Sequence, residues 1–218
     1  MMLQISAIFR TARRAMAVAA VLSVPVAVSA QGVTGLFNSG VDGSGTKMSV
    51  GSTDTHYTVN QNGNAQAIVT NNGAYVQNAN AGYIWQDASG NPGSTTRTFR
   101  TSFNVTTGYD PLTAFVTGRW STDNAGTDIF LNGVSTGITS GGFGSFTPFS
   151  INSGFVAGVN TLEFQVADYG APGAFAVTDL QGNAQVAVSA APEPASILLM
   201  ATGFVGVGLV GVRRKIRS

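Results

Sequence analysis

Two apolar segments at opposite ends of the chain restrict what the 218 residues can fold into. The N-terminal segment carries three arginines, Arg10, Arg13 and Arg14, and continues as an apolar run from Ala15 to Val28, which is shorter than the roughly 20 residues that span a bilayer. Ser29 and Ala30 then supply the small side chains that a signal peptidase reads. The sequence therefore predicts a signal peptide over residues 1–30, with an uncleaved membrane anchor as the alternative.

The C-terminal apolar segment, residues 195–212, carries no charge and as a helix would be about 27 Å long, close to the thickness of the hydrocarbon layer. A short basic tail follows it, with cations at Arg213, Arg214, Lys215 and Arg217. Such a cluster stays in the cytoplasm, which leaves the preceding chain outside. We therefore predict a transmembrane helix over residues 195–212 and a cytoplasmic tail over residues 213–218.

A Pro-Glu-Pro triplet, Pro192, Glu193 and Pro194, stands directly before this helix. The two prolines favour an extended segment that a processing enzyme could grip. The order of triplet, apolar helix and basic tail over residues 192–218 resembles a PEP-CTERM sorting signal. The resemblance implies an exosortase-type sorting enzyme as partner, and delivery to the cell surface or extracellular matrix of a Gram-negative bacterium. An ordinary single-pass anchor is the alternative.

The middle of the chain is acidic, although the whole chain has a net charge of +1. Residues 31–191 hold four cations and nine acids, a net charge of −5. A nucleic-acid partner needs a basic surface, so this charge argues against one. The chain has no cysteine, which excludes disulfides and thiolate metal sites.

Apolar and polar residues alternate with a period of two in several segments of the middle region, and no helical pattern is sustained. In Phe99–Val105 the apolar side chains fall on one face, and Thr161–Asp168 repeats the pattern. Further strands are predicted at 67–70 and 74–77 (a hairpin across Asn71-Asn72-Gly73), 82–86, 112–120, 128–134, 175–180 and 184–188. The sequence thus predicts an all-β ectodomain over residues 31–191, an antiparallel β-sandwich.

The stretches LTAFVTGRWSTDNAGTDIFLNGVSTGI and FTPFSINSGFVAGVNTLEFQVADYG resemble galactose-binding-like jelly rolls, many of which bind carbohydrate. The resemblance covers residues 99–188. It implies a jelly-roll version of the sandwich, and function would then depend on the loops rather than on the scaffold.

No catalytic residue is assigned. His56 is the single histidine and is interpreted as a strand residue, because no nucleophile elbow accompanies it. A glycoside hydrolase, the remote alternative, would need two matched carboxyl groups. The candidates are Asp123, Asp128, Glu163, Asp168 and Asp179.

Sugar binding would need an exposed aromatic ring beside polar groups. Candidate ligand-binding residues are Tyr109, Arg119, Trp120 and Tyr169, with Trp85 as a further ring. Trp120 is expected to lie in the core, because the period of two places it on the same strand face as apolar residues. Calcium is the one candidate cofactor, with oxygen ligands from Asp123, Asn124 and Asp128; the alternative is that these residues only shape a turn.

The sequence therefore predicts an exported, non-catalytic protein that is a structural or interaction component of the extracellular polysaccharide matrix. A carbohydrate-binding module is the alternative. The predicted partners are the signal peptidase, the sorting enzyme, the membrane before processing, and exopolysaccharide.

Overall fold

The computed structural model describes residues 32–60, 64–91 and 93–188, which all lie within one compact unit. The described residues form β-strands and one short 3-10 helix, η1 (Pro111–Thr113). The strands are β1 (Val33–Thr34), β2 (Thr53–Val59), β3 (Ala65–Thr70), β4 (Tyr83–Trp85), β5 (Thr95–Val105), β6 (Phe115–Asp123), β7 (Ala125–Leu131), β8 (Val134–Ser135), β9 (Thr147–Ile151), β10 (Gly158–Asp168) and β11 (Ala174–Asn183).

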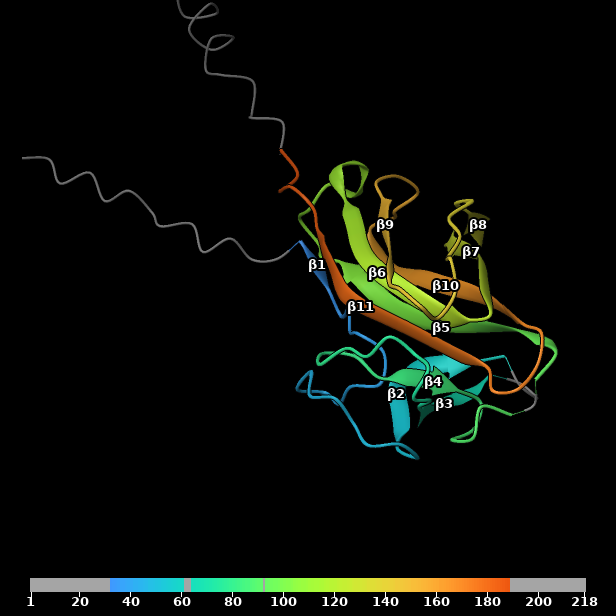
Figure 1. Cartoon of the computed structure of the whole chain (residues 1–218). Helices are drawn as coiled ribbons and strands as arrows, with labels where there is room; N and C mark the ends of the chain where they lie inside the picture. Colours follow the sequence, from blue (N-terminus) through green and yellow to red (C-terminus); the bar gives the residue numbers. More distant parts are fainter. Residues whose placement is uncertain (1–31, 61–63, 92, 189–218) are drawn as a thin grey trace, which may run out of the picture. The chain divides into compact units, whose positions relative to one another are not determined.

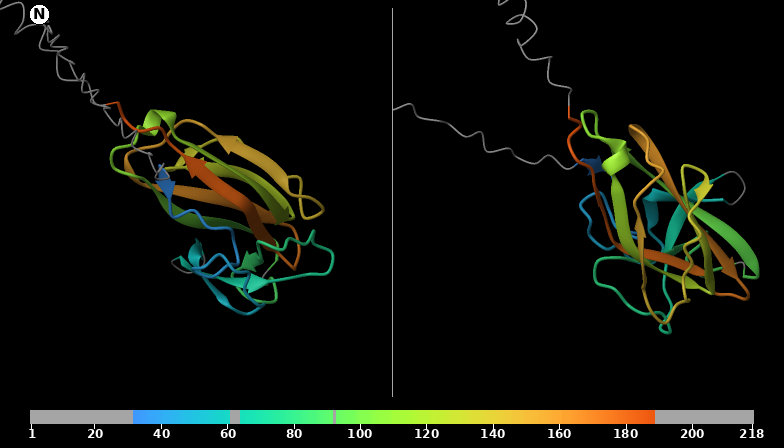
Figure 2. Two further views of the ribbon diagram at one scale, coloured as in Figure 1. Left: turned by 90° about the vertical axis from the view of Figure 1, so that its left-hand side faces the viewer. Right: turned by 90° about the horizontal axis from the view of Figure 1, so that it is seen from above.

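All strand pairs are antiparallel, and hydrogen bonds connect the strands in the order β8-β7-β10-β5-β2-β3-β4-β11-β6-β9, with β1 paired to β5. The sheet folds over on itself. The layer that contains β10 and β5 faces the layer that contains β11 and β6, and β2, β3 and β4 connect the two along one side (Figures 1 and 2). The predicted antiparallel β-sandwich is confirmed.

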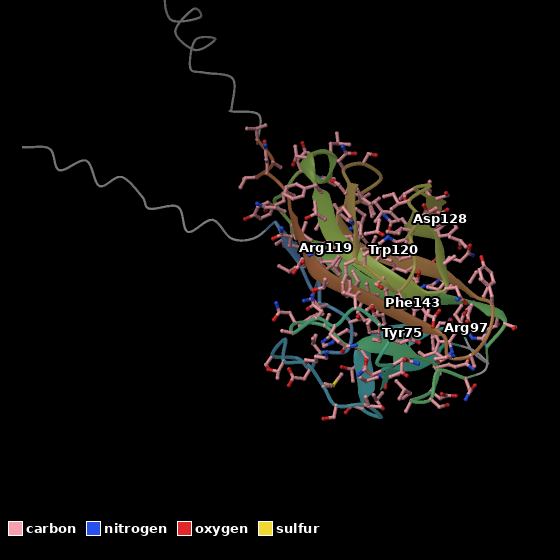
Figure 3. All side chains as sticks on the ribbon, in the orientation of Figure 1. Tyr75, Arg97, Arg119, Trp120, Asp128 and Phe143 are labelled. Atoms are coloured by element: carbon pink, nitrogen blue, oxygen red, sulfur yellow. The ribbon has the colours of Figure 1, made fainter. Side chains whose placement is uncertain are left out.

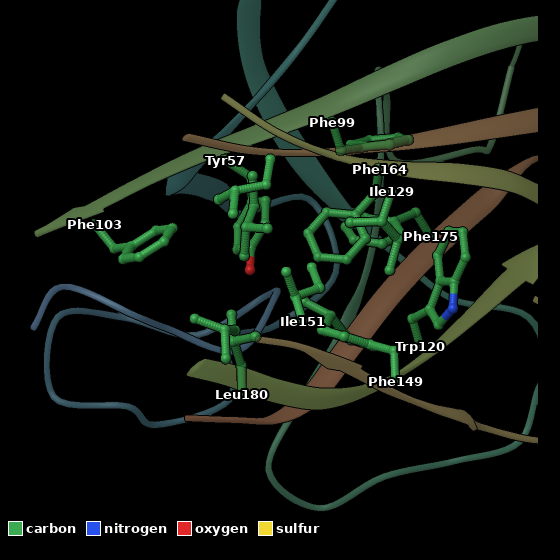
Figure 4. Packing of buried hydrophobic residues seen from close by; sticks show 14 of the residues in the cluster. Tyr57, Phe99, Phe103, Trp120, Ile129, Phe149, Ile151, Phe164, Phe175 and Leu180 are labelled. Atoms are coloured by element: carbon green, nitrogen blue, oxygen red, sulfur yellow. The ribbon is translucent and has the colours of Figure 1, made fainter. Parts of the chain in front are cut away.

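The core lies between the two layers and is built by the alternation that the sequence shows. Leu162, Phe164 and Val166 on β10 are fully buried. The ring of Phe164 lies 4.9 Å from that of Phe175 on β11 and 5.7 Å from that of Trp120 on β6, measured between centroids (Figure 4). Aromatic contacts across the layers therefore hold the sandwich closed.

Some predicted elements differ from the structure. Residues 74–77 form no strand, because Tyr75 turns its ring into a separate apolar cluster on the outer face of the sandwich. Leu112 does not point inward but is 86% exposed, because Asp110 caps η1 and Pro111 begins that helix. The stretch 184–188 joins the fold by a single β-bridge, at Val186, rather than as a strand.

The register defines two ends of the sandwich. At the end that we call the terminal end lie the connections 106–114, 132–133 and 152–157, together with the stretch 184–188 that follows β11. At the other, distal end lie the connections 86–94 and 169–173 and the β6–β7 junction at Asn124. β1 begins at the terminal end as well, since Val33 pairs with Val105 (Figure 1).

The predicted signal peptide (1–30), the Pro192-Glu193-Pro194 triplet, the transmembrane helix (195–212) and the basic tail (213–218) lie outside the described residues. In the part of the chain that the structure describes, no helix is long and apolar enough to cross a membrane.

Candidate functional site

Two carboxyl groups meet at the distal end of the sandwich. Asp123 ends β6 and Asp168 ends β10, and their side chains are only 6% and 2% exposed. Oδ2 of Asp123 accepts a hydrogen bond from the hydroxyl of Tyr75 at 3.1 Å. Oδ1 of Asp168 accepts from the backbone N–H of Gly170, whereas Oδ2 of Asp168 has no hydrogen-bond partner within the described residues.

A strap formed by residues 71–78 covers this acid pair. Its Tyr75 packs in a small apolar cluster with Tyr83 and Phe143, at ring distances of 4.6 and 5.8 Å (Figure 3). The backbone N–H of Val76 donates to the carbonyl of Phe143 at 3.0 Å and ties the strap down. The strap therefore keeps the Asp123 carboxyl group away from solvent.

Burial raises the pKa of Asp123 above its usual value; the hydrogen bond from Tyr75 opposes this shift, and the charge of Asp168 adds to it. Burial, followed by the charge of Asp123, also holds the pKa of Tyr75 well above the ordinary value for tyrosine. The tyrosine is therefore a hydrogen-bond donor at neutral pH, and it is not set up to act as a base.

The raised pKa of Asp123 has a consequence for stability. A carboxyl group whose pKa is higher in the folded state binds more protons there than in the unfolded state, so its contribution to stability falls as the pH rises above about 4. Replacing Asp123 with Asn keeps an acceptor for Tyr75 and removes the buried charge. In thermal unfolding between about pH 4 and pH 7, we expect Asp123→Asn to gain stability relative to the wild type as the pH rises. A difference that stays constant or shrinks with rising pH would contradict this assignment.

The structure brings two of the predicted site residues together at the distal end. The backbone N–H of Tyr169 donates to Oδ1 of Asn124 at 2.7 Å, and the Tyr169 side chain is 70% exposed. Asp128 has different partners: its carboxylate accepts from the hydroxyl of Ser135 in β8 and from the N–H of Gly137, two residues after that strand. Each predicted calcium ligand thus accepts at least one hydrogen bond from the protein, and the described residues contain no group of three or more acidic, histidine or cysteine side chains that could hold a metal. Calcium binding stays a prediction.

The remaining candidate residues lie apart from this pair. Trp120 is fully buried in the core, as its position on the apolar face of the strand indicated, and Trp85 is fully buried as well. The guanidinium of Arg119 lies 3.6 Å from a carboxylate oxygen of Asp179 and 5.9 Å from the ring centre of Phe146, on the outer face of β6 (Figure 3).

Two further residues have structural partners. Tyr109, at the terminal end, packs partly buried against the core, and its backbone bridges to Val186. His56 lies in β2 as interpreted, with its ring stacked on Phe37 at 3.8 Å between centroids.

A groove that the sequence did not indicate lies on the outer face of β5 and β2. It has a volume of about 480 Å³ and is lined by Gly35, Phe37, Thr55, His56, Thr58, Arg100, Thr101 and Ser102. We call it the hydroxyl groove, because four of its residues carry hydroxyl groups beside an aromatic ring and a cation. Three segments far apart in the sequence form it through the pairing of β1 and β2 with β5, so no local motif could reveal it.

Comparison with known proteins identifies the C-terminal signal. Residues 190–215 match the family described as the PEP-CTERM protein-sorting motif. The motif implies an exported, membrane-anchored protein that an exosortase recognises. No curated protein sequence matches the chain.

Three solved structures are similar to part of this chain. A CBM35 from Paenibacillus barcinonensis is 21% identical, with a TM-score of 0.35 over 58% of this chain and 93% of that one. A family 35 carbohydrate-binding module from an environmental isolate is 13% identical, with a TM-score of 0.30 over 76% and 96% of the two chains. An exo-β-1,3-galactanase from Phanerochaete chrysosporium, solved with β-1,3-galactotriose, is 13% identical, with a TM-score of 0.29 over 56% and 27%. Similarity at this level carries no argument about what this chain binds.

Proposed function

Because the chain carries a PEP-CTERM sorting motif, we propose that it is a non-catalytic protein delivered to the cell surface, where its β-sandwich is a structural or interaction component of the extracellular polysaccharide matrix. The sorting enzyme and the membrane are its partners during delivery, and exopolysaccharide surrounds it afterwards.

The placement of the aromatic side chains is the observation that supports a structural role most directly. Within the described residues only Phe115 and Tyr169 are exposed aromatic side chains, at 40% and 70%, and they come from different ends of the sandwich. A flat sugar platform needs aromatic rings gathered on one accessible surface. Here the rings instead fill the core and the cluster beneath the strap.

The carboxyl groups also support a non-catalytic function. Glu163 pairs with Arg100, and Asp179 pairs with Arg119. Asp123 and Asp168 lie beneath the strap with little exposure, whereas a glycosidase pair must flank the scissile bond of a bound sugar. Glycoside hydrolysis requires two carboxyl groups that are both close to each other and accessible to the sugar. None of these four carboxyl groups meets both conditions.

The hydroxyl groove favours a second candidate function, noncovalent binding of a polysaccharide chain. Its hydroxyl groups could orient sugar hydroxyls beside the partly exposed ring of Phe37, and Arg100 could meet an acidic sugar. The guanidinium of Arg100 is already paired with Glu163, so a neutral sugar fits the groove at least as well as an anionic one.

One retention experiment tests both functions. The mature chain and a Ser102→Tyr variant, which places a bulky side chain at the exposed lining of the groove, would be recovered from the washed matrix of producing cells. For the proposed structural role we expect equal retention of both chains and an unchanged polysaccharide chain length. Asn104→Tyr is the matched control, because Asn104 is exposed on the same strand face outside the groove.

Two other results would contradict the proposed structural role. Release of Ser102→Tyr alone, with Asn104→Tyr retained, would replace the structural role with glycan binding in the groove. Shortening of the polysaccharide by the purified chain would contradict a non-catalytic function.

A further inference from the structure

Exposed aliphatic side chains gather at the terminal end of the sandwich. Nine large apolar side chains are exposed among the described residues, and seven of them lie on or next to this end: Phe115, at 40%, and six aliphatic side chains. The six aliphatic side chains are 50–96% exposed: Leu112, Val134, Val156, Val159, Val186 and Val188. Exposed apolar side chains that occur singly need no explanation, but a group at one end indicates an interaction surface.

Hydrogen bonds hold the segments that present these side chains. The buried amide of Asn160 accepts from the N–H of Val156 at 2.9 Å and donates to the carbonyl of Val156 at 2.7 Å. The amide of Asn132, in the turn before Val134, donates to Oδ1 of Asn160 at 2.9 Å, which joins the two loops. The apolar side chains are therefore displayed in fixed positions.

Hydrogen bonds also join the segment 106–114 to the segment 184–188. The N–H of Asp110 donates to the carbonyl of Gln185 at 2.8 Å, and the N–H of Ala187 donates to that of Gly108 at 2.8 Å. Leu112 and Val186 are thus presented by neighbouring segments.

The terminal end is almost without charge. Asp110 is the one charged residue among residues 106–114, 132–136, 152–159 and 184–188, and its carboxylate accepts from the N–H of Leu112 as the cap of η1. The end offers no cation to an acidic partner. Its contacts are therefore apolar, and little dependence on salt is expected.

The position of this end along the chain identifies the surface that it meets. Six residues separate Val188 from Ala195, where the uncharged segment of the sorting signal begins, and the seven residue-to-residue steps reach at most about 25 Å in a fully extended chain. While the chain is anchored, the terminal end therefore stays close to the bilayer. We propose that the terminal end docks on the lipid surface of the membrane, with its exposed aliphatic side chains inserted at the level of the headgroups. This proposal depends on the membrane-anchored stage of the proposed function.

The absence of cysteine from the chain allows a direct test with single labels. Full chains carrying Leu112→Cys or Val156→Cys would be labelled with a polarity-sensitive fluorophore and reconstituted into phosphatidylcholine vesicles that contain nitroxide-labelled lipid. Side chains inserted about 5–10 Å deep should lose roughly half of their emission to shallow nitroxides. Ser89→Cys, in an exposed loop of the distal end, is the control and should keep its emission.

A second set of variants separates docking from mere proximity. Adding Leu112→Ser and Val186→Ser to the Val156→Cys chain should restore most of the emission if the aliphatic side chains drive insertion. Equal quenching in this variant and its parent would overturn the proposal.

Two other outcomes would overturn it as well. The first is unquenched labels on chains that float with the vesicles, which would leave anchoring intact. The second is energy transfer between labelled copies that rises with the ratio of protein to lipid, which would assign the surface to a second copy of the chain. Chains that fail to float would remove the anchor itself, and the proposed delivery with it.

Discussion

Replacing Trp120 with Ala is expected to lower the free energy of unfolding by about 3–5 kcal/mol, because this ring is fully buried between the layers of the sandwich. It packs against Phe164, and it lies so close to Gly126 that a Cβ atom there would be 2.4 Å from the ring. In thermal unfolding of the purified ectodomain, a loss of this size should lower the Tm by roughly 10 °C.

Tyr169→Ala is the matched control, since Tyr169 is an aromatic candidate from the same sequence argument but is 70% exposed. It should change the stability by no more than about 0.5 kcal/mol. A Trp120→Ala chain that unfolds at the wild-type temperature would mean that this ring does not hold the two layers together.

Replacing Pro192, Glu193 and Pro194 together with Ala is expected to abolish delivery beyond the membrane. The triplet lies within the matched sorting motif, and the exosortase that the motif implies would lose the sequence it recognises. The uncharged segment after it is unchanged, so the chain should remain in the membrane fraction. Fractionation of cells, followed by immunodetection of membrane and matrix, measures the effect.

Ser196→Ala is the control for this variant, because it changes a neighbouring residue and leaves the triplet intact. It should reach the matrix in wild-type amounts. Recovery of the triple-alanine chain from the matrix would show that sorting does not depend on the triplet.

The sequence could predict those parts of the fold in which local pattern and burial agree. On β5 and β10 every second side chain faces the core, so the period of two in Phe99–Val105 and Thr161–Asp168 was sufficient. The Asn132-Gly133 turn was also predictable, since both residues have the positive φ that such a turn requires.

The predicted hairpin at residues 67–77 was wrong for a tertiary reason. Asn72-Gly73 has the residues of a hairpin turn, but β3 pairs with β4 at Tyr83–Trp85, and the stretch between them becomes the strap. The burial of Tyr75 against Tyr83 decides this, and the partners of that contact are not adjacent in the sequence.

The candidate sites were less predictable than the strands. Asp123 and Asp168 meet because β6 and β10 end at the same end of the sandwich, and their separation of 45 residues shows no motif. The hydroxyl groove and the apolar terminal end likewise depend on strand register. The sorting signal was predictable because its parts are contiguous and ordered along the chain.

Mass spectrometry of the C-terminus of chains recovered from the cell surface or matrix tests the central claim most directly. Delivery through the sorting motif predicts chains that end near Pro192–Pro194 and lack both the uncharged segment and the residues Arg213–Ser218. Chains recovered from the surface with that basic tail intact would contradict the account.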